Sequence, residues 1–517
     1  MNEIDAATQL EPQANAPGNH VTTLATGATV ALAGRMIGRG LHVVGQVLLA
    51  RFLGPEAFGL YAIGWTLLRV VGLLAPLGLD NGVIRFAAPH WRKDQAALQS
   101  VLYQSFSLAL LSGFCVSASF YLAAPWLGGT LFQKPDLVPV LRYLAWAFWP
   151  LAGLRVFAAA TTLSQSMRYA VQAEEVAQPL INLLLIITFY FLGWGLLGAT
   201  AAAVISFSVA LLLAVYYLAR LFPFRVRPQF GPRSTVKELL SFSMPASLSF
   251  VLGVYILWVD RLMVGYFLPE AEVGIYQAAS QSSLLFATIL GAMNAIFSPM
   301  IAELIHQKEK QQLEELFRVS TKWGLYLSVP LFLTLCFVPR EVMTVVFGLQ
   351  YEGGYMLLVI LAVAQLVNVG TGAVNILLIM AGYQKRWLVT STVMLAVNIG
   401  LNALLIPQVG LVGAAVATAA TVCGLFVAGL LQVRHLLKIW PYDGRYLKGF
   451  LATLLTALAL WGLQSANVAS PALALTLALV ISGFVFSLTL LVTGLDSEDR
   501  HFISLVLMRS GLVKSEK

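Results

Sequence analysis

The stretch Ala50-Arg-Phe-Leu-Gly-Pro-Glu-Ala-Phe-Gly-Leu-Tyr61 decides the fold, because it joins two long apolar runs with almost no loop between them. The dipeptide Gly54-Pro55 marks a tight turn, since glycine and proline both interrupt regular helix. A second turn, at Leu268-Pro269, joins two further apolar runs in the same way. The runs on either side of each turn are therefore expected to be antiparallel neighbours.

The composition indicates that lipid surrounds these runs. Hydrophobic residues make up 59% of the 517 positions and charged residues only 11%, whereas a soluble domain carries about 25% charged residues. Because a membrane-spanning helix needs about 20 mainly apolar residues, we expect an all-α integral membrane protein with about fourteen transmembrane helices. The expected spans are 23–50, 56–79, 98–124, 138–162, 176–193, 195–221, 239–268, 271–304, 318–346, 355–381, 387–407, 409–436, 446–466 and 471–495.

Two parts of the sequence match at a single offset of 215 residues, which predicts an internal repeat. The matching segments are 52–53 with 267–268, 59–61 with 274–276, and 195–199 with 410–414. The alternative is a chance coincidence of small and apolar residues. If the repeat is real, each unit holds an even number of spans, so the two halves share one orientation. An axis along the membrane normal then relates them.

The repeat predicts two six-helix lobes, arranged as a parallel repeat, and two additional C-terminal helices. The expected segments are a cytoplasmic N-terminal tail 1–22, an N-terminal lobe 23–222, a basic cytoplasmic linker 223–238, a C-terminal lobe 239–437, two extra transmembrane helices 438–495 and a cytoplasmic amphipathic tail 496–517.

Lys and Arg residues are shared unequally between the two sides of the expected membrane. When the connections are numbered alternately, 23 of the 32 Lys and Arg residues fall on the side of the N-terminal tail and 4 on the other side. Because positively charged loops face the cytoplasm, both termini are expected to be cytoplasmic. This placement of charge in short loops along a membrane face also argues against a nucleic acid partner.

Several charged side chains fall inside the apolar runs of the first half. Arg35, Arg39 and His42 follow an i, i+4, i+7 spacing and therefore share one face of the first span. Arg69 in the second span and Arg155 in the fourth can reach a similar depth, given a rise of about 1.5 Å per residue. An arginine at the bilayer centre costs at least about 2.5–3.5 kcal/mol. Since no acidic residue is expected deep in the first six spans, these five side chains predict a site for an anion such as phosphate.

Alternatives remain for each of these charges. Snorkelling to the membrane surface, or hydrogen bonds to backbone carbonyls, would also satisfy the arginines. In the seventh span, Asp260 and Arg261 either pair for structural reasons or form a coupling or gating site between the halves. Gly34 and Gly38 have the spacing of a close helix contact.

The sequence shows no catalytic constellation and no sizeable soluble domain that could hold one. We therefore expect no enzyme activity and no cofactor. Cys115, Cys336 and Cys423 lie far apart within apolar runs, which favours a role in packing over a disulfide or a metal site. No metal ligands are expected.

The segment 50–61 resembles the region after the first span in bacterial polysaccharide transporters of the Wzx flippase type. So does Val259-Asp-Arg-Leu-Met-Val-Gly-Tyr-Phe-Leu-Pro-Glu-Ala-Glu-Val-Gly-Ile-Tyr276, and the resemblance covers nearly the whole chain. It implies the fold shared by multidrug (MATE) exporters and the lipid II flippase, with two lobes around a central cavity that opens alternately to each side. It also implies a substrate, undecaprenyl diphosphate carrying a short oligosaccharide, moved to the periplasmic leaflet for O-antigen, capsule or exopolysaccharide biosynthesis.

The resemblance also concerns the cavity and the partners. Flippases of this group have cationic cavities, and Arg35, Arg39 and Arg69 look like the counterparts here, matched by span and depth. The implied partners are the lipid-linked oligosaccharide and membrane lipid, with the polysaccharide polymerase machinery and a coupling ion, H⁺ or Na⁺, as further candidates. The implied location is the bacterial inner membrane.

Three other functions remain open. A cation-coupled MATE-type drug exporter has the same fold, although a cationic drug favours acidic residues and the deep charges of the first half are basic. A lipid II flippase would carry a peptidoglycan precursor. A scaffold or channel-like membrane protein would have no transport cycle.

Overall fold

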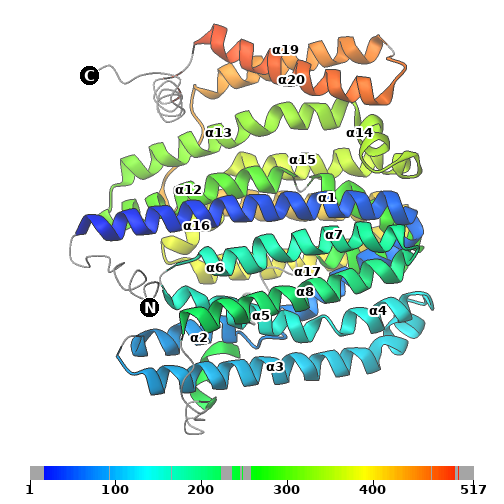
Figure 1. The fold of residues 1–517 in the computed structure, drawn as a ribbon. Coiled ribbons are helices and arrows are strands. Elements are labelled where there is room, and N and C mark those ends of the chain that lie inside the picture. Colours follow the sequence, from blue (N-terminus) through cyan, green and yellow to red (C-terminus); the bar gives the residue numbers. More distant parts are fainter. Residues whose placement is uncertain are drawn as a thin grey trace, which may run out of the picture.

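The computed structural model describes residues 17–91, 93–164, 166–222, 236–244, 247, 258–283, 285–466, 468–494, 496 and 499. Parts of four expected segments lie outside these residues: most of the N-terminal tail, most of the linker 223–238, residues 245–246 and 248–257 of the span 239–268, and all but two residues of the amphipathic tail. Every regular element in the described part of the chain is a helix, and the longer helices run side by side along one common direction (Figure 1).

The first lobe comprises eight α-helices and four short irregular helices. They are α1 (Pro17–Gly72), α2 (Leu79–Ala87), η2 (Ala88–His90), α3 (Gln95–Pro125), η3 (Trp126–Leu131), α4 (Leu137–Ala145), α5 (Phe148–Thr161), η4 (Thr162–Ser164), α6 (Arg168–Ala170), η5 (Val171–Ala177), α7 (Gln178–Phe191) and α8 (Gly195–Leu221). The elements η3 and η5 are π-helical.

The second lobe follows a short helical segment, 236–244. Its helices are α10 (Val259–Phe267), α11 (Glu270–Ser283), α12 (Leu285–Gln307), α13 (Lys310–Phe337), α14 (Pro339–Val346), η6 (Leu349–Gly354), α15 (Tyr355–Thr371), α16 (Val374–Met380), α17 (Gln384–Val409) and α18 (Leu411–Leu437). Two further helices, α19 (Tyr446–Ser465) and α20 (Pro471–Thr493), complete the described chain.

In the described residues, 11 helices are long and apolar enough to cross a membrane. One of them, Ala33–Gly72, is bent at Gly54 and so supplies two arms. Residue 284 of the expected span 271–304, between α11 and α12, lies outside the described residues, and so do residues 245–246 and 248–257 of the expected span 239–268. The predicted all-α multi-pass membrane fold is therefore confirmed, whereas the expected number of spans stays a prediction.

The turn after the first span folds α1 back on itself. Gly54 has φ 74° and ψ 173°, which lies in the region that side chains disfavour, and Pro55 follows it. The ring of His42 on one arm stacks on Trp65 of the other, with ring centres 5.7 Å apart. This contact confirms the predicted antiparallel pair. The start of α1 and the end of α20 lie at the same end of the bundle, opposite this turn (Figure 1).

The two lobes meet where the second arm of α1 crosses α11. A Cβ atom on Gly59 would collide with the carbonyl oxygen of Glu270, and one on Gly274 would collide with that of Pro55. Gly59 and Gly274 are separated by the same 215-residue offset as Pro55 and Glu270. The same glycine–carbonyl contact therefore occurs twice, once with a glycine of the first lobe and once with a glycine of the second. A two-fold axis between the lobes requires such a pair of contacts. This reciprocity confirms the repeat.

The last two helices, α19 and α20, pack against the second lobe through α13 and α14. Lys322 of α13 is 1% exposed, and its ammonium group lies 3.0 Å from a carboxylate oxygen of Asp496 and 2.9 Å from one of Asp499. Burial alone would raise the pKa of Asp496, but hydrogen bonds from Lys448 and Lys322 outweigh it and hold that pKa below its ordinary value. The chain beyond α20 is thereby tied to α13.

The crossing predicts that alanine at either glycine destabilises the protein. In Gly59→Ala or Gly274→Ala, the new methyl group would meet a backbone oxygen that cannot rotate away, and overpacking of this kind costs about 1–3 kcal/mol. Thermal unfolding of the purified protein in detergent should show a lower midpoint for both variants. Gly483→Ala on α20 is the matched control, because nothing lies within 4 Å of its Cβ position. Unchanged midpoints in all three variants would contradict the close crossing.

Candidate functional site

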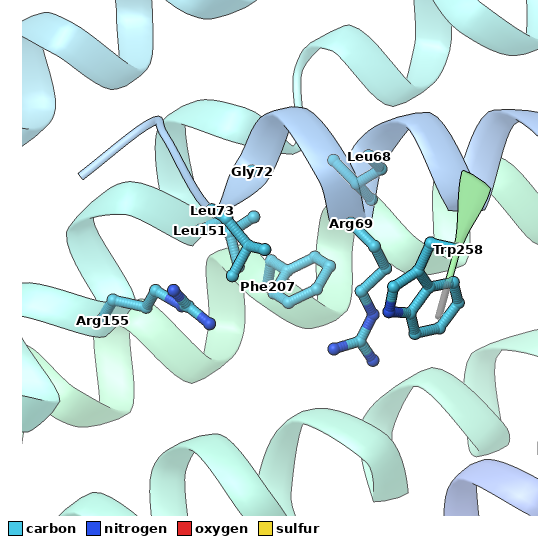
Figure 2. A pocket seen from close by; sticks show the side chains of 8 residues that line it. All are labelled: Leu68, Arg69, Gly72, Leu73, Leu151, Arg155, Phe207 and Trp258. Atoms are coloured by element: carbon cyan, nitrogen blue, oxygen red, sulfur yellow. The ribbon is translucent and has the colours of Figure 1, made fainter. Parts of the chain in front are cut away.

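A cavity of about 240 Å³ lies within the first lobe, beside the start of α10. Its lining consists of Leu68, Arg69, Gly72, Leu73, Leu151, Arg155, Phe207 and Trp258. Figure 2 shows the guanidinium groups of Arg69 and Arg155 extending from different helices, with Leu73, Leu151 and Phe207 between them. The cavity is therefore positively charged and otherwise mainly apolar.

Aromatic rings hold the Arg69 side chain in place. The guanidinium carbon lies 5.0 Å from the centre of the Trp65 ring, a distance at which the cation is attracted to the ring face. Trp65 stacks in turn on His42, Tyr61 and Phe207, with ring centres 5.7, 5.8 and 6.3 Å away. His42 is not a lining residue of the cavity, so it supports Arg69 through Trp65.

Two glycines bring the π-helical turn η5 against α1. A Cβ atom on Gly34 would collide with the side chain of Val171, and one on Gly38 would collide with the carbonyl oxygen of Glu175. The close contact predicted from the spacing of these glycines is confirmed, and η5 is the partner. A π-helical turn within a longer helix is frequently found at a functional site.

This contact places carboxylates beside the arginines. Arg35 Nε lies 3.8 Å from Glu175 Oε1. The expectation that no acidic residue lies deep in the first six spans was wrong, because the helix begins at Arg168 and carries both carboxylates into the span Arg168–Phe191.

The structure brings together only part of the predicted cluster. Arg69 and Arg155 line one cavity, whereas Arg35 pairs with Glu175 of η5 and is not among the lining residues. Arg39 is exposed and points to the second lobe, where a Cβ atom on Gly291 of α12 would lie 2.6 Å from Arg39 Nη1. Arg39 is therefore placed where the two lobes face each other.

Asp260 and Arg261 lie in a buried network of the second lobe, with exposures of 3% and 2%. The guanidinium group lies 3.5 Å from Asp260 Oδ1 and donates hydrogen bonds of 2.8 Å to Gln277 Oε1 and 2.5 Å to Ser280 Oγ. The hydroxyl of Tyr276 donates to Asp260 Oδ2 at 2.8 Å. The pair is thus held by partners within its own lobe, and a gating role for it stays a prediction.

Two contacts connect this network to the rest of the site. The amide of Gln277 donates to Gln46 Oε1 of the first lobe at 3.4 Å. The Arg261 guanidinium carbon lies 4.9 Å from the ring centre of Trp258, and Trp258 lines the cavity beside Arg69. A change in the packing of Trp258 would therefore alter both the lining of the cavity and the surroundings of the Asp260–Arg261 pair.

The lobes are also joined by three side chains near the Gly54 turn, here called the latch: Arg51, Lys134 and Tyr351. Arg51 donates to the carbonyl oxygens of Val345 and Val346, the latter at 2.8 Å from Nε. Lys134 Nζ donates to the Leu268 carbonyl at 2.8 Å, and the Tyr351 hydroxyl donates to the Ala50 carbonyl at 2.8 Å. Arg51 and Lys134 both fall in the expected loops that carry few positive charges. This unusual position is the one feature of the sequence that distinguishes these two cations.

The fold and the site together define a multi-pass membrane transporter with a cationic cavity. The chain belongs to the family of polysaccharide biosynthesis proteins, which matches residues 48–354. It is 25% identical over 393 residues to a probable low-salt glycan biosynthesis flippase, Agl15, of Haloferax volcanii; the match covers 74% of this chain and 78% of that protein.

Two solved structures share the fold. The lipid II flippase MurJ in an inward closed conformation superposes with a TM-score of 0.72 and 14% identity, over 94% of this chain and 100% of that chain. A MATE family multidrug resistance transporter in an inward-facing conformation superposes with a TM-score of 0.63 and 20% identity, over 80% of this chain and 98% of that chain. The predicted MATE-like architecture is thereby confirmed.

The buried network predicts that Arg261→Ala strongly destabilises the protein. Removing one partner of a buried ion pair leaves the other charge uncompensated and costs about 3–5 kcal/mol. The thermal unfolding midpoint should fall well below that of the wild-type protein. Arg340→Ala is the control, because its ion pair with Glu352 is exposed, and an exposed pair contributes about 0–1 kcal/mol. Equal midpoints for the two variants would contradict a structural role for Arg261.

Proposed function

We propose that this protein is a flippase for undecaprenyl-diphosphate-linked oligosaccharide repeat units. It moves them from the cytoplasmic to the periplasmic leaflet of the bacterial inner membrane, by alternating access, for surface polysaccharide biosynthesis. The observation that carries the proposal is the pair of arginines, Arg69 and Arg155, in an otherwise mainly apolar cavity among the membrane helices. The family's role in polysaccharide biosynthesis and the flippase name of a relative support the same function.

The physical chemistry of the substrate matches this cavity. A diphosphate cannot cross hydrocarbon alone, because its charges would lose their hydration. Guanidinium groups replace that hydration with paired hydrogen bonds to phosphate oxygens. The lipid tail can remain in the bilayer while the head group passes through the protein.

The size of the cavity suits a phosphate group better than a whole repeat unit. Pockets for drug-sized ligands enclose about 300–1,000 Å³, whereas this cavity has about 240 Å³. In our proposal the diphosphate occupies it, and Arg35 and Arg39, which are exposed, contact the substrate where the lobes face each other. The sugar then extends into the space that the lobes enclose.

A drug exporter of the same fold is less well supported. A cationic drug requires a carboxylate that is available to it, and the lining of the cavity contains none. Glu175 of η5, near the cavity arginines, is paired with Arg35. The charge of the described cavity therefore favours an anionic substrate.

We propose that both ends of the chain are cytoplasmic and that the Gly54 turn faces the periplasm, as the Lys and Arg distribution predicts. The latch joins the lobes at this turn, so the structure then represents a state closed to the periplasm. In this scheme the network of Asp260 and Arg261 is a gating element, because Gln277 connects it to the first lobe. Release to the periplasm requires the latch bonds to break.

The anion site predicts that Arg35→Ala, Arg39→Ala and Arg69→Ala each reduce transport while the protein remains folded and inserted. A hydrogen bond to a charged group contributes about 1.5–3 kcal/mol, so each loss should weaken substrate binding by about 10- to 100-fold. The measurement is accumulation of lipid-linked repeat units on the inner leaflet of cells that carry only the variant.

Arg142→Ala serves as the control for these three variants. Arg142 lies over the ring of Tyr121, outside the cavity, and its replacement should leave transport intact. Normal export of polysaccharide by all three cavity variants would refute the proposed anion site.

The latch predicts that Tyr351→Phe favours opening to the periplasm, because one bond between the lobes is lost. In a variant without the free thiols Cys115, Cys336 and Cys423, a cysteine in place of Leu73 in the cavity reports access. A membrane-impermeant maleimide added outside should label it faster when Tyr351→Phe is present. Tyr355→Phe is the control, since Tyr355 contacts Arg340 of its own lobe. Equal labelling rates would rule out a role for the latch in closure.

A further inference from the structure

We propose that Glu175 is a built-in counter-anion that pairs with Arg35 between transport cycles, so that the substrate must displace it in order to bind. This inference rests on the proposed function, and it identifies a residue that sets the affinity for the diphosphate. The ligand class is a diphosphate ester, which replaces the carboxylate as the partner of the same guanidinium group.

The backbone of η5 is arranged for this contact. Gly34 and Gly38 of α1 lack the side chains that would keep the helix at an ordinary distance, and Gly38 faces the carbonyl of Glu175 itself. The seven residues of η5 are π-helical, whereas α6 and α7 on either side are α-helical. The wider turn carries two consecutive carboxylates on the part of the helix that faces α1 and α5.

The segment η5 packs against the two helices that carry the arginines. Arg35 and Arg69 belong to α1, and Arg155 belongs to α5. Neighbouring guanidinium groups repel each other in a medium of low dielectric constant, so a carboxylate on η5 that pairs with Arg35 stabilises the site while no substrate is bound.

The ion pair of Arg35 with Glu175 has the properties of an exchangeable contact. Its atoms are 3.8 Å apart, and the two side chains are 58% and 40% exposed. The pair of Arg261 with Asp260, in contrast, has side chains that are 3% and 4% exposed and is enclosed by further hydrogen bonds. A phosphate oxygen can therefore reach Arg35 and replace the carboxylate, whereas it cannot reach Arg261.

Competition of this kind also explains how the substrate could leave. A diphosphate held by three unopposed arginines would bind too tightly to be released in the other leaflet. A carboxylate that returns to Arg35 lowers the affinity and accelerates release. The neutral variant Glu175→Gln should therefore bind a diphosphate more tightly and transport it more slowly.

The test uses the purified full-length protein and inorganic pyrophosphate as the probe, with binding measured by titration calorimetry. Because the ion pair is partly exposed, we expect Glu175→Gln to bind pyrophosphate about two- to fivefold more tightly than the wild-type protein. Glu175→Asp, which keeps the charge, should behave like the wild-type protein. In the export assay, Glu175→Gln should show a lower maximal rate despite the higher affinity.

The chain offers a closely matched control in Glu352→Gln. Glu352 pairs with Arg340 at the same 3.8 Å, and the Arg340 and Glu352 side chains are 59% and 43% exposed, yet this pair lies in the second lobe, on η6 and α14, and not beside the arginines of α1. Its replacement should leave pyrophosphate affinity unchanged. An equal increase in both variants would mean that the effect comes from overall charge, and it would overturn the inference.

The outcomes separate this inference from the proposed function. If Arg35→Ala and Arg69→Ala lose pyrophosphate binding but Glu175→Gln binds no more tightly than the wild-type protein, the anion site stands and the counter-anion inference fails. If neither the wild-type protein nor Glu175→Gln binds pyrophosphate, both fail. Tighter binding by Glu175→Gln that depends on Arg69 supports both.

Discussion

The cost of placing an arginine inside a membrane is the constraint on which the rest of this structure depends. An isolated guanidinium group there is expensive, and three of the deep arginines, Arg261, Arg69 and Arg35, have a compensating contact. Arg261 is enclosed with Asp260 in a buried network. Arg69 lies over the Trp65 ring, and Arg35 pairs with Glu175. The difference in exposure between these contacts separates charge that supports the fold from charge that a substrate can reach.

Close backbone contacts at glycine residues make these pairings possible. Gly34 and Gly38 admit η5 to the surface of α1, which brings Glu175 within reach of Arg35. Gly59 and its repeat counterpart Gly274 admit the other lobe in the same way. Since these contacts involve backbone atoms, no side-chain rearrangement can relieve them. A change of side-chain rotamer therefore cannot separate the lobes at their crossing.

The location of the contacts between the lobes indicates how the site and the closure are connected. The latch lies beside the crossing, at the Gly54 turn, whereas Arg39 and Gly291 face each other farther along α1. Trp258 and Gln277 lie on the path between these regions, one lining the cavity and the other bonded across the lobes. The structure thus holds contacts between the lobes both at the Gly54 turn and farther along α1, beside Arg39.

The sequence by itself determined the features that depend on local patterns. The length of the apolar runs predicted an all-α membrane protein, Gly54-Pro55 predicted the antiparallel turn, and the 215-residue offset predicted the repeat. Each of these features depends on residues that are adjacent or regularly spaced in the sequence. Only the tertiary structure decided which charges meet. The π-helical segment η5 places Glu174 and Glu175 beside α1. Arg39 lies against Gly291 of α12 and is not among the residues that line the cavity. Such pairings depend on which helices become neighbours and on their rotation, and no local pattern specifies either.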